Sequence, residues 1–327
     1  PRCLWIRPSV KFLKKYLKEH PVDLIVSTGP PQSMHLIARG VSLATGIPWV
    51  ADFRDPWTKI FYFKHLKLSS WARRKHFKLE QKVLDDATAV VAVSPLVQAD
   101  FAAMTATPVH LVTNGYDESD YIDAVEPDCG FNIVHTGLLT AEGNPVELWK
   151  ALGDKCREDQ AFAEKFRLIL AGKTDEKVLN TISEAGLDAY LTNLGYIDHT
   201  QAVKEQRKAA VLILPIREEP ETKAILPGKL FEYLAARRPI LGVGTREGAM
   251  ATVLQETGAG KIFDWCDAED IRKYIDDCWD KFCIPGANDS TFGNLTTEAA
   301  DIDRFSRGAL TKKMTEIFEL TINSKDE

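Results

Sequence analysis

Short apolar runs alternate with longer helical stretches along this 327-residue chain, and this alternation constrains its fold more than any other feature. Turn-forming residues bound the runs, as they bound the buried strands of α/β proteins. Strands are expected at 22–27, 49–51, 89–93, 109–112, 131–135, 166–171, 191–197, 211–216 and 239–243. Helices are expected at 9–20, 33–44, 71–85, 145–157, 200–210 and 304–320, with further helices after Pro95, between Lys173 and Leu191, and around Lys229. Strands that alternate with helices predict parallel sheets with right-handed crossovers.

The pattern is interrupted once, by a polar segment at residues 117–130 that contains Pro127, Gly130 and several acidic residues. Such a composition is typical of a connection between domains. The sequence therefore predicts an α/β protein with two Rossmann-like parallel-sheet domains that face each other across a cleft. The expected bounds are 1–122 for the first domain, 123–303 for the second and 304–327 for a C-terminal helix. Open α/β sheets bind ligands beyond the carboxyl ends of their strands, so the cleft is the expected site.

The composition is that of a globular protein, with 45% hydrophobic and 27% charged residues. No apolar run approaches the ~18–20 residues that span a membrane. The six cysteines form no Cys-x-x-Cys pair, which argues against a zinc site and against a disulfide scaffold. Reduced thiols are the plain interpretation, so the expected location is the cytoplasm.

The net charge of −6 is unevenly distributed, because residues 1–125 carry +4 and the remainder carries −10. The positive charge concentrates in two segments, Lys11–Lys18 and Lys59–Lys82, and the second interleaves lysines with the aromatic residues Phe61–Phe63. An anionic membrane surface and a nucleic acid are both candidate partners for such a segment. The plain alternative is a solvated helical face.

The most informative motif is an expected strand, Leu212–Ile216, followed by a loop and a helix that starts near Pro227. Pro227 suits a first helical position, and Gly228 allows a ligand to approach the backbone. Lys229 lies at the positive end of the helix dipole, an unfavourable place for a lysine unless an anion neutralises it. Glu232 shares a helix face with Lys229. A cation for phosphate and a carboxylate for sugar hydroxyls indicate a sugar-nucleotide site; the alternative is a surface Lys–Glu pair on an ordinary helix.

Asp52, Arg54 and Asp55 follow an expected strand of the first half, at the end of the sheet that would face the cleft. A carboxylate there can orient an acceptor hydroxyl, and Arg54 can offset developing phosphate charge. The alternative is a structural Arg–Asp pair that fixes the loop. His35 begins an expected helix and could reach the same cleft, although a lone histidine is more often structural.

Several other site classes are excluded or disfavoured. The chain contains neither Gly-x-Gly-x-x-Gly nor the P-loop motif, which disfavours a dinucleotide dehydrogenase and a P-loop NTPase. Its one Asp-x-Asp, Asp301–Asp303, follows no hydrophobic strand and precedes the terminal helix, so a helix-start role is expected. We therefore expect no catalytic metal and no cofactor other than the donor substrate.

In their order and spacing, these motifs resemble the retaining glycosyltransferases of family 4, which have the GT-B fold. In the first half the resemblance rests on residues 49–57 (WVADFRDPW), 91–95 (VAVSP) and 113–117 (TNGYD). In the second half it rests on residues 135–138 (HTGL), 170–172 (LAG), 193–197 (NLGYI) and the helix that carries Lys229 and Glu232.

The resemblance implies a role for each motif of the second half. Lys229 would hold the donor diphosphate, together with the helix start at Pro227 and Gly228 and the backbone amides of the turn at Gly137 and Leu138. Glu232 would bind the ribose hydroxyls, and Tyr196 and Ile197 would flank the base. Lys173 or Arg217 could replace the cations that the family often carries after the glycine turn, or either could be an ordinary loop cation.

Two departures from the family pattern stand out. Ala224 occupies the position of the first glutamate in the family's Glu-x7-Glu motif. The family also opens with a strand and a Gly-rich turn that have no counterpart before residue 22, so the first domain is expected to be N-terminally shortened and incomplete.

The function that the resemblance implies is transfer of a sugar from a nucleoside diphosphate sugar to a lipid-linked or saccharide acceptor, with retention, in surface polysaccharide or lipopolysaccharide assembly. The C-terminal helix would pack back on the first domain. Peripheral attachment to the inner face of an anionic membrane is expected, and no nucleic acid partner. The alternatives are a sugar-nucleotide 2-epimerase on the same fold and a non-catalytic sugar-nucleotide or partner-binding module.

Overall fold

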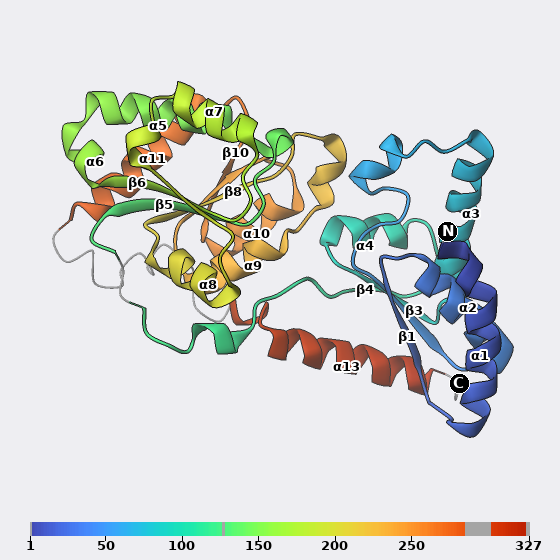
Figure 1. The fold of residues 1–327 in the computed structure, drawn as a ribbon. Coiled ribbons are helices and arrows are strands. Elements are labelled where there is room, and N and C mark those ends of the chain that lie inside the picture. Colours follow the sequence, from blue (N-terminus) through green and yellow to red (C-terminus); the bar gives the residue numbers. More distant parts are fainter. Residues whose placement is uncertain (1, 126–127, 285–301, 325–327) are drawn as a thin grey trace. The chain divides into compact units, whose positions relative to one another are not determined.

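The computed structural model describes residues 2–125, 128–284 and 302–324. The chain separates into two compact units, one built from residues 1–114 and 309–327 and the other from residues 115–308 (Figure 1). Each unit has its own parallel sheet, with strand order β1-β2-β3-β4 in the first and β10-β9-β8-β5-β6-β7 in the second. The expected α/β fold with two parallel sheets is therefore confirmed.

The sheet of the first unit is built from short apolar strands whose residues are mostly buried. Its strands are β1 (Ile25–Gly29), β2 (Trp49–Phe53), β3 (Ala89–Ala92) and β4 (Val109–Leu111). The helices that follow or precede them are α1 (Ile6–Glu19), α2 (Ser33–Thr45), α3 (Ser70–Asp86) and α4 (Pro95–Ala102). Every residue of β2 is buried, as expected of a strand covered on both faces.

The C-terminal helix α13 (Arg307–Asn323) packs on the sheet of the first unit. Its apolar residues recur at helical spacing, so they form one stripe. That stripe, Leu310, Met314, Ile317 and Phe318, lies against the buried residues Val50, Ala89, Val91 and Val112. The last helix of the chain thus completes the core of the first unit.

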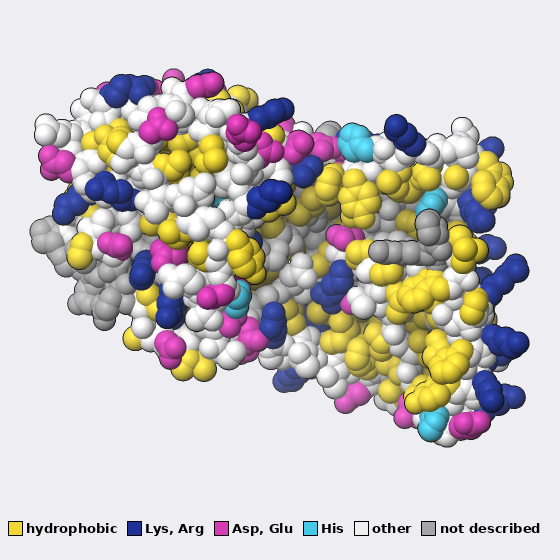
Figure 2. Space-filling view, viewed as in Figure 1, with side chains coloured by type: hydrophobic (Ala, Val, Ile, Leu, Met, Phe, Trp, Pro, Cys, Tyr) yellow, Lys and Arg dark blue, Asp and Glu magenta, His cyan; other side chains and the backbone are white. Residues whose placement is uncertain are grey.

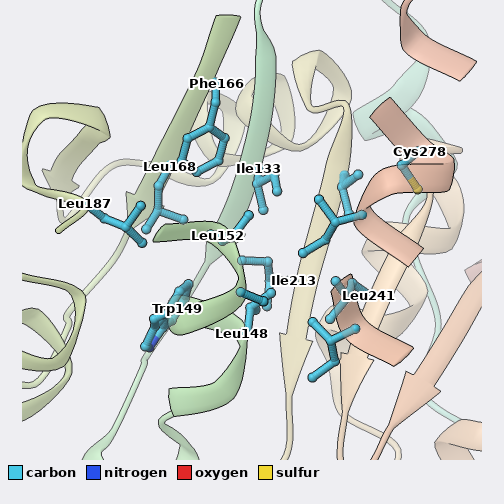
Figure 3. Close-up of a cluster of buried hydrophobic side chains, with 14 of the residues drawn as sticks. Ile133, Leu148, Trp149, Leu152, Phe166, Leu168, Leu187, Ile213, Leu241 and Cys278 are labelled. Atoms are coloured by element: carbon cyan, nitrogen blue, oxygen red, sulfur yellow. The ribbon is translucent and has the colours of Figure 1, made fainter. Parts of the chain in front are cut away.

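The second unit has a six-stranded sheet with a hydrophobic core on each face. Its strands are β5 (Phe131–Thr136), β6 (Phe166–Ala171), β7 (Leu191–Gly195), β8 (Val211–Pro215), β9 (Ile240–Val243) and β10 (Gly260–Phe263). Its helices are α5 (Val146–Glu158), α6 (Gln160–Lys165), α7 (Glu176–Glu184), α8 (His199–Lys208), α9 (Gly228–Ala236), α10 (Ala249–Thr257) and α11 (Ala268–Phe282). Figure 3 shows Leu148, Trp149 and Leu152 of α5 against residues of the sheet.

The division between the units falls after Asn114, because Tyr116 is part of the second core. Tyr116 forms a parallel bridge with Ser306 and is only 7% exposed. Residues 117–125, which the sequence assigns to a linker, include a 3-10 turn at Glu118–Tyr121. In the described part of the chain, no helix is both long and apolar enough to cross a membrane.

One local expectation is corrected. Pro227 is not the first residue of α9 but the residue before it, with φ −63° and ψ 142°. Its extended ψ lies outside the helical region, so the helix begins at Gly228. The first-turn backbone N–H groups without a backbone acceptor therefore belong to Gly228 and Lys229, since the Leu230 N–H donates to the Pro227 carbonyl at 3.0 Å.

Candidate functional site

The carboxyl ends of β5 and β6 meet at two glycines. Gly137 follows β5 with φ +124°, and Gly172 follows β6 with φ +128°, values that favour glycine. A Cβ on Gly172 would lie 2.1 Å from the carbonyl oxygen of Gly137, so the two turns pack backbone against backbone. This edge of the sheet therefore presents main chain rather than side chains.

One backbone amide of the β5 turn remains available. The Gly137 N–H donates to the Ala171 carbonyl at 2.7 Å, and the Leu139 N–H donates to the Lys173 carbonyl at 3.0 Å. Between them, the Leu138 N–H makes no backbone–backbone hydrogen bond among the described residues, the Leu138 backbone interacts with the His135 ring, and Leu138 is 65% exposed. The Gly137 and Leu139 amides are thus occupied, which leaves the amide of Leu138 as the candidate donor in this turn.

The first turn of α9 lies beside this turn. A Cβ on Gly137 would lie 3.5 Å from Lys229 Cε, and a Cβ on Gly228 would meet nothing within 4 Å. The Lys229 ammonium donates to Glu232 Oε2 at 2.8 Å, so the two side chains share a helix face as their spacing predicts. A cation, a carboxylate and free helical N–H groups thus gather at the carboxyl end of β5.

A buried network behind Glu232 was not anticipated from the sequence. Gln206 of α8 donates from its amide nitrogen to Glu232 Oε2 and to Thr136 Oγ, each at 2.9 Å. The Tyr233 hydroxyl accepts from the Thr136 N–H at 2.9 Å. Burial raises the pKa of Tyr233 to about 12, so its hydroxyl stays protonated. No short sequence motif could identify these residues, because they come from three separate elements.

His135 of β5 is a further buried polar residue at this edge. Its Nδ1 lies 3.0 Å from the Ile213 carbonyl, and burial lowers the pKa of the imidazole. A carbonyl only accepts, so the neutral ring carries its proton on Nδ1 and leaves Nε2 as an acceptor. Nε2 is buried without a hydrogen-bond partner in the described structure.

Three other expected residues of the second unit lie on neighbouring strand ends. Lys173 directly follows the β6 turn and is exposed. Tyr196 and Ile197 follow the edge strand β7, and the Tyr196 side chain is 93% exposed. The structure gives none of the three a contact with Lys229 or Glu232. Ala224 closes a 3-10 turn, Pro220–Ala224, and supplies no carboxylate before α9.

In the first unit, charged residues at the end of β2 and just after it form a second cluster. Arg54 Nε donates to Asp52 Oδ2 at 2.9 Å, and its Nη1 reaches the carbonyls of Val112 and Thr113 at 3.4 and 3.3 Å. Asp52 is only 7% exposed. The Arg54–Asp52 pair fixes the loop, while Asp52 Oδ1 and the Thr113 hydroxyl remain buried and without hydrogen-bond partners among the described residues.

Helix α3 holds the rest of this loop through a buried carboxylate. Glu80, which is 1% exposed, accepts from the N–H groups of Trp57 and Thr58 at 3.2 and 3.1 Å and from the Thr58 hydroxyl. Burial is the largest influence on Glu80 and raises its pKa, and burial also raises the pKa of Asp55. Asp55 therefore lies in a loop whose backbone is fixed from a neighbouring helix.

His35 is buried at the start of α2. Its Nδ1 lies 2.8 Å from Ser27 Oγ, which also accepts from Trp49 Nε1 at 2.8 Å. Its ring stacks on Phe53, with ring centroids 4.4 Å apart. Burial lowers the pKa of His35 to about 3, so the ring is neutral at physiological pH. These contacts hold the imidazole firmly between the first two strands.

The described residues include no group of three or more His, Cys, Asp or Glu side chains that could hold a metal ion. Of the Asp-x-Asp motif, Asp303 accepts from the Tyr116 hydroxyl at 3.5 Å, while Asp301 lies outside the described residues.

One family model and several solved structures are similar to this chain. The model of Glycosyltransferase Family 4 matches residues 1–120. A search of curated proteins found no match. This match covers less than half of the chain and ends at residue 120, so Lys229 and Glu232 lie outside it.

The solved structures that are similar to this chain have the GT-B fold. Sucrose-phosphate synthase from Thermosynechococcus elongatus matches over 99% of this chain and 80% of that chain, with a TM-score of 0.69 and 16% identity. The lipopolysaccharide outer core galactosyltransferase WaaB matches over 99% and 81%, with a TM-score of 0.64 and 14% identity. A UDP-forming α,α-trehalose-phosphate synthase from Burkholderia xenovorans matches over 97% and 77%, with a TM-score of 0.63 and 12% identity. At these identities the likeness shows the fold, and this chain has the GT-B fold.

Proposed function

We propose that this protein is a retaining glycosyltransferase, which moves a sugar from a nucleoside diphosphate sugar to an acceptor hydroxyl. The observation that carries the proposal is the start of α9, where Lys229 and Glu232 lie 2.8 Å apart beside the Gly137–Leu138 turn. The family match over residues 1–120 and the GT-B fold support the same reaction class.

The donor diphosphate binds at the carboxyl end of β5 in this proposal. The Lys229 side chain is 32% exposed, so its ammonium can turn from Glu232 to a phosphate oxygen. The Leu138 N–H and the first N–H groups of α9 are further donors to the phosphates. Together they stabilise the negative charge that develops on the departing diphosphate while the sugar becomes oxocarbenium-like. A catalytic metal is not required for this charge neutralisation.

The acceptor belongs to the first unit in this proposal. Asp52 is held by Arg54 and keeps Oδ1 without a partner, so it can orient an acceptor hydroxyl. Asp55 has a pKa raised by burial, which places its carboxylate nearer to the range of a general base. His35 contributes a neutral, fixed imidazole that supports the ends of β1 and β2.

The first unit is also the proposed membrane-facing part. Trp71 is 65% exposed, and Tyr62 and Leu66 are each 42% exposed, within a segment rich in lysine and arginine. Figure 2 shows hydrophobic side chains gathered on the visible face of this unit, with Lys and Arg side chains along its border. Such a surface fits peripheral attachment to anionic lipid and a lipid-linked acceptor of surface polysaccharide or lipopolysaccharide assembly.

A product assay tests the proposal. UDP-sugars are the first donors to use, because one similar structure is described as UDP-forming. We expect nucleoside diphosphate release that depends on an added acceptor, with the anomeric configuration of the donor kept in the product. An isomerised donor without any acceptor would instead indicate a 2-epimerase.

Ala224 favours one alternative of a different class, a non-catalytic sugar-nucleotide-binding module, since it lacks the carboxylate of the family motif. Nucleotide binding without turnover over a broad panel of acceptors would favour the module.

A further inference from the structure

Gln206 is an unusual residue for its position, because glutamine side chains are mostly exposed and this one has no exposure to solvent. It lies near the end of α8, and its amide nitrogen has two acceptors, Glu232 Oε2 and Thr136 Oγ, each at 2.9 Å. A primary amide has two N–H hydrogens, so both are used by these two acceptors.

The orientation of the amide follows from its partners. The Glu232 carboxylate only accepts hydrogen bonds, so the nitrogen of Gln206, and not its oxygen, faces Glu232. The hydroxyl of Thr136 in turn lies 3.3 Å from the Tyr233 hydroxyl, which also accepts from the Thr136 backbone at 2.9 Å. The network therefore ties the end of β5, helix α8 and helix α9 to one another.

The same network decides which part of Glu232 is open to a ligand. Oε2 accepts from both Gln206 and Lys229, whereas Oε1 has no donor among the described residues. When Lys229 turns to a phosphate, as the proposed function requires, Gln206 remains the donor that holds the carboxylate in place. Oε1 and the second lone pair of Oε2 then have no donor from the described residues and can accept hydrogen bonds from a ligand.

We propose that Gln206 is a positioning residue for the Glu232 carboxylate. Held by Gln206, the carboxylate accepts hydrogen bonds from two neighbouring ribose hydroxyls, and it thereby selects a ribonucleotide donor. This inference rests on the proposed function, because it requires a nucleoside diphosphate sugar bound at Lys229, with Glu232 at the ribose as the family resemblance implies. To the proposed function, the inference adds the reason why the Glu232 carboxylate is oriented as it is and the class of donor that this orientation selects.

Calorimetric titration of UDP and of 2′,3′-dideoxy-UDP tests the inference. Gln206→Met keeps the length of the side chain and removes both donors. We expect a loss of about tenfold or more in UDP affinity, as for removal of a hydrogen bond to a charged group, and little change for the dideoxy compound. Gln206→Glu places a second carboxylate beside that of Glu232, and the two repel each other. This variant should therefore lose the preference for UDP over the dideoxy compound.

The control is Gln201→Met on the same helix, where the amide donates to Glu205 Oε1 at 2.8 Å and to no residue of the site. This variant should keep the wild-type ratio of the two affinities. The ratio is measured on one preparation, so a smaller folded fraction lowers both affinities alike. An unchanged ratio in both Gln206 variants would overturn the inference, whereas a wild-type protein that binds no UDP or other nucleoside diphosphate would overturn the proposed function instead.

Discussion

At the scale of single residues, His35 makes the stability of the first unit depend on pH. Its pKa is about 3 in the folded protein, against 6.5 for an ordinary histidine, because burial disfavours the charged ring. Between these two pH values, His35 is protonated in the unfolded chain and neutral in the folded protein. The contribution of His35 to the free energy of unfolding is fully present above pH 6.5. It falls by about 1.4 kcal/mol per pH unit as the pH drops from 6.5 towards 3.

We expect His35→Asn to weaken this pH dependence of stability over the same interval. The measurement is denaturant unfolding at several pH values, followed by tryptophan fluorescence. His20→Asn is the control, because His20 is exposed at the end of α1 and should leave the slope as in the wild type. Equal slopes in wild type and His35→Asn would show that His35 is not the titrating group.

The residues of the candidate site divide by how locally they are encoded. The shared face of Lys229 and Glu232 follows from a spacing of three residues, so it could be predicted from the sequence. The roles of Gln206 and Thr136 could not, because α8, β5 and α9 are brought together only by the sheet. The same holds for Glu80, whose partners Trp57 and Thr58 precede it by more than twenty residues.

At the scale of elements, the loop after β2 depends on α3. Glu80→Met keeps a side chain of similar length but leaves the buried N–H groups of Trp57 and Thr58 without their acceptor. We expect a loss of about 1–3 kcal/mol in the free energy of unfolding for a buried donor left unsatisfied. Transfer of the sugar to its acceptor substrate should be slowed more than nucleotide binding is weakened, because the loop carries Asp55.

Thermal unfolding and steady-state kinetics check this expectation. Lys78→Met on the exposed face of α3 is the matched control and should behave as the wild type in both measurements. If Glu80→Met has wild-type stability, the carboxylate does not anchor the loop.

Most elements could be predicted from periodicity, and the exceptions have physical reasons. The strand β10, Gly260–Phe263, has only four residues and lies at the edge of its sheet, so its apolar signal is weak. Helices α6, α10 and α11 were not predicted either, although the buried residues of α11 recur at helical spacing: Ile271, Tyr274, Ile275, Cys278 and Trp279. That signal is present in the sequence. The packing of α13 on the first sheet, in contrast, follows from no local pattern, and only the family resemblance suggested it.

At the scale of the whole molecule, the charge is divided along the chain, with +4 on residues 1–125 and −10 on the rest. We expect the protein to sediment with vesicles that contain anionic lipid and to be released by salt, because each basic residue near the surface contributes about 1 kcal/mol. Replacing Lys64, Lys67, Arg73 and Arg74 together by glutamine should greatly reduce binding.

The matched control replaces four exposed lysines of the second unit by glutamine: Lys150, Lys165, Lys177 and Lys273. This variant should bind the vesicles as the wild type does. If both variants bind equally, or if the wild type ignores anionic vesicles at low salt, the basic segments are merely solvated and a soluble acceptor is indicated.

The central claim is that the start of α9 binds the diphosphate of a sugar nucleotide through Lys229. Calorimetry with UDP and with uridine tests it most directly, in the wild type, in Lys229→Ala and in the control Lys223→Ala, whose ammonium pairs with Glu247 at 3.1 Å. We predict that Lys229→Ala weakens UDP binding by about tenfold or more and leaves uridine binding nearly unchanged, since a charge-assisted phosphate contact contributes about 1.5–3 kcal/mol. Lys223→Ala should match the wild type. Equal UDP affinity in the wild type and Lys229→Ala would contradict the claim.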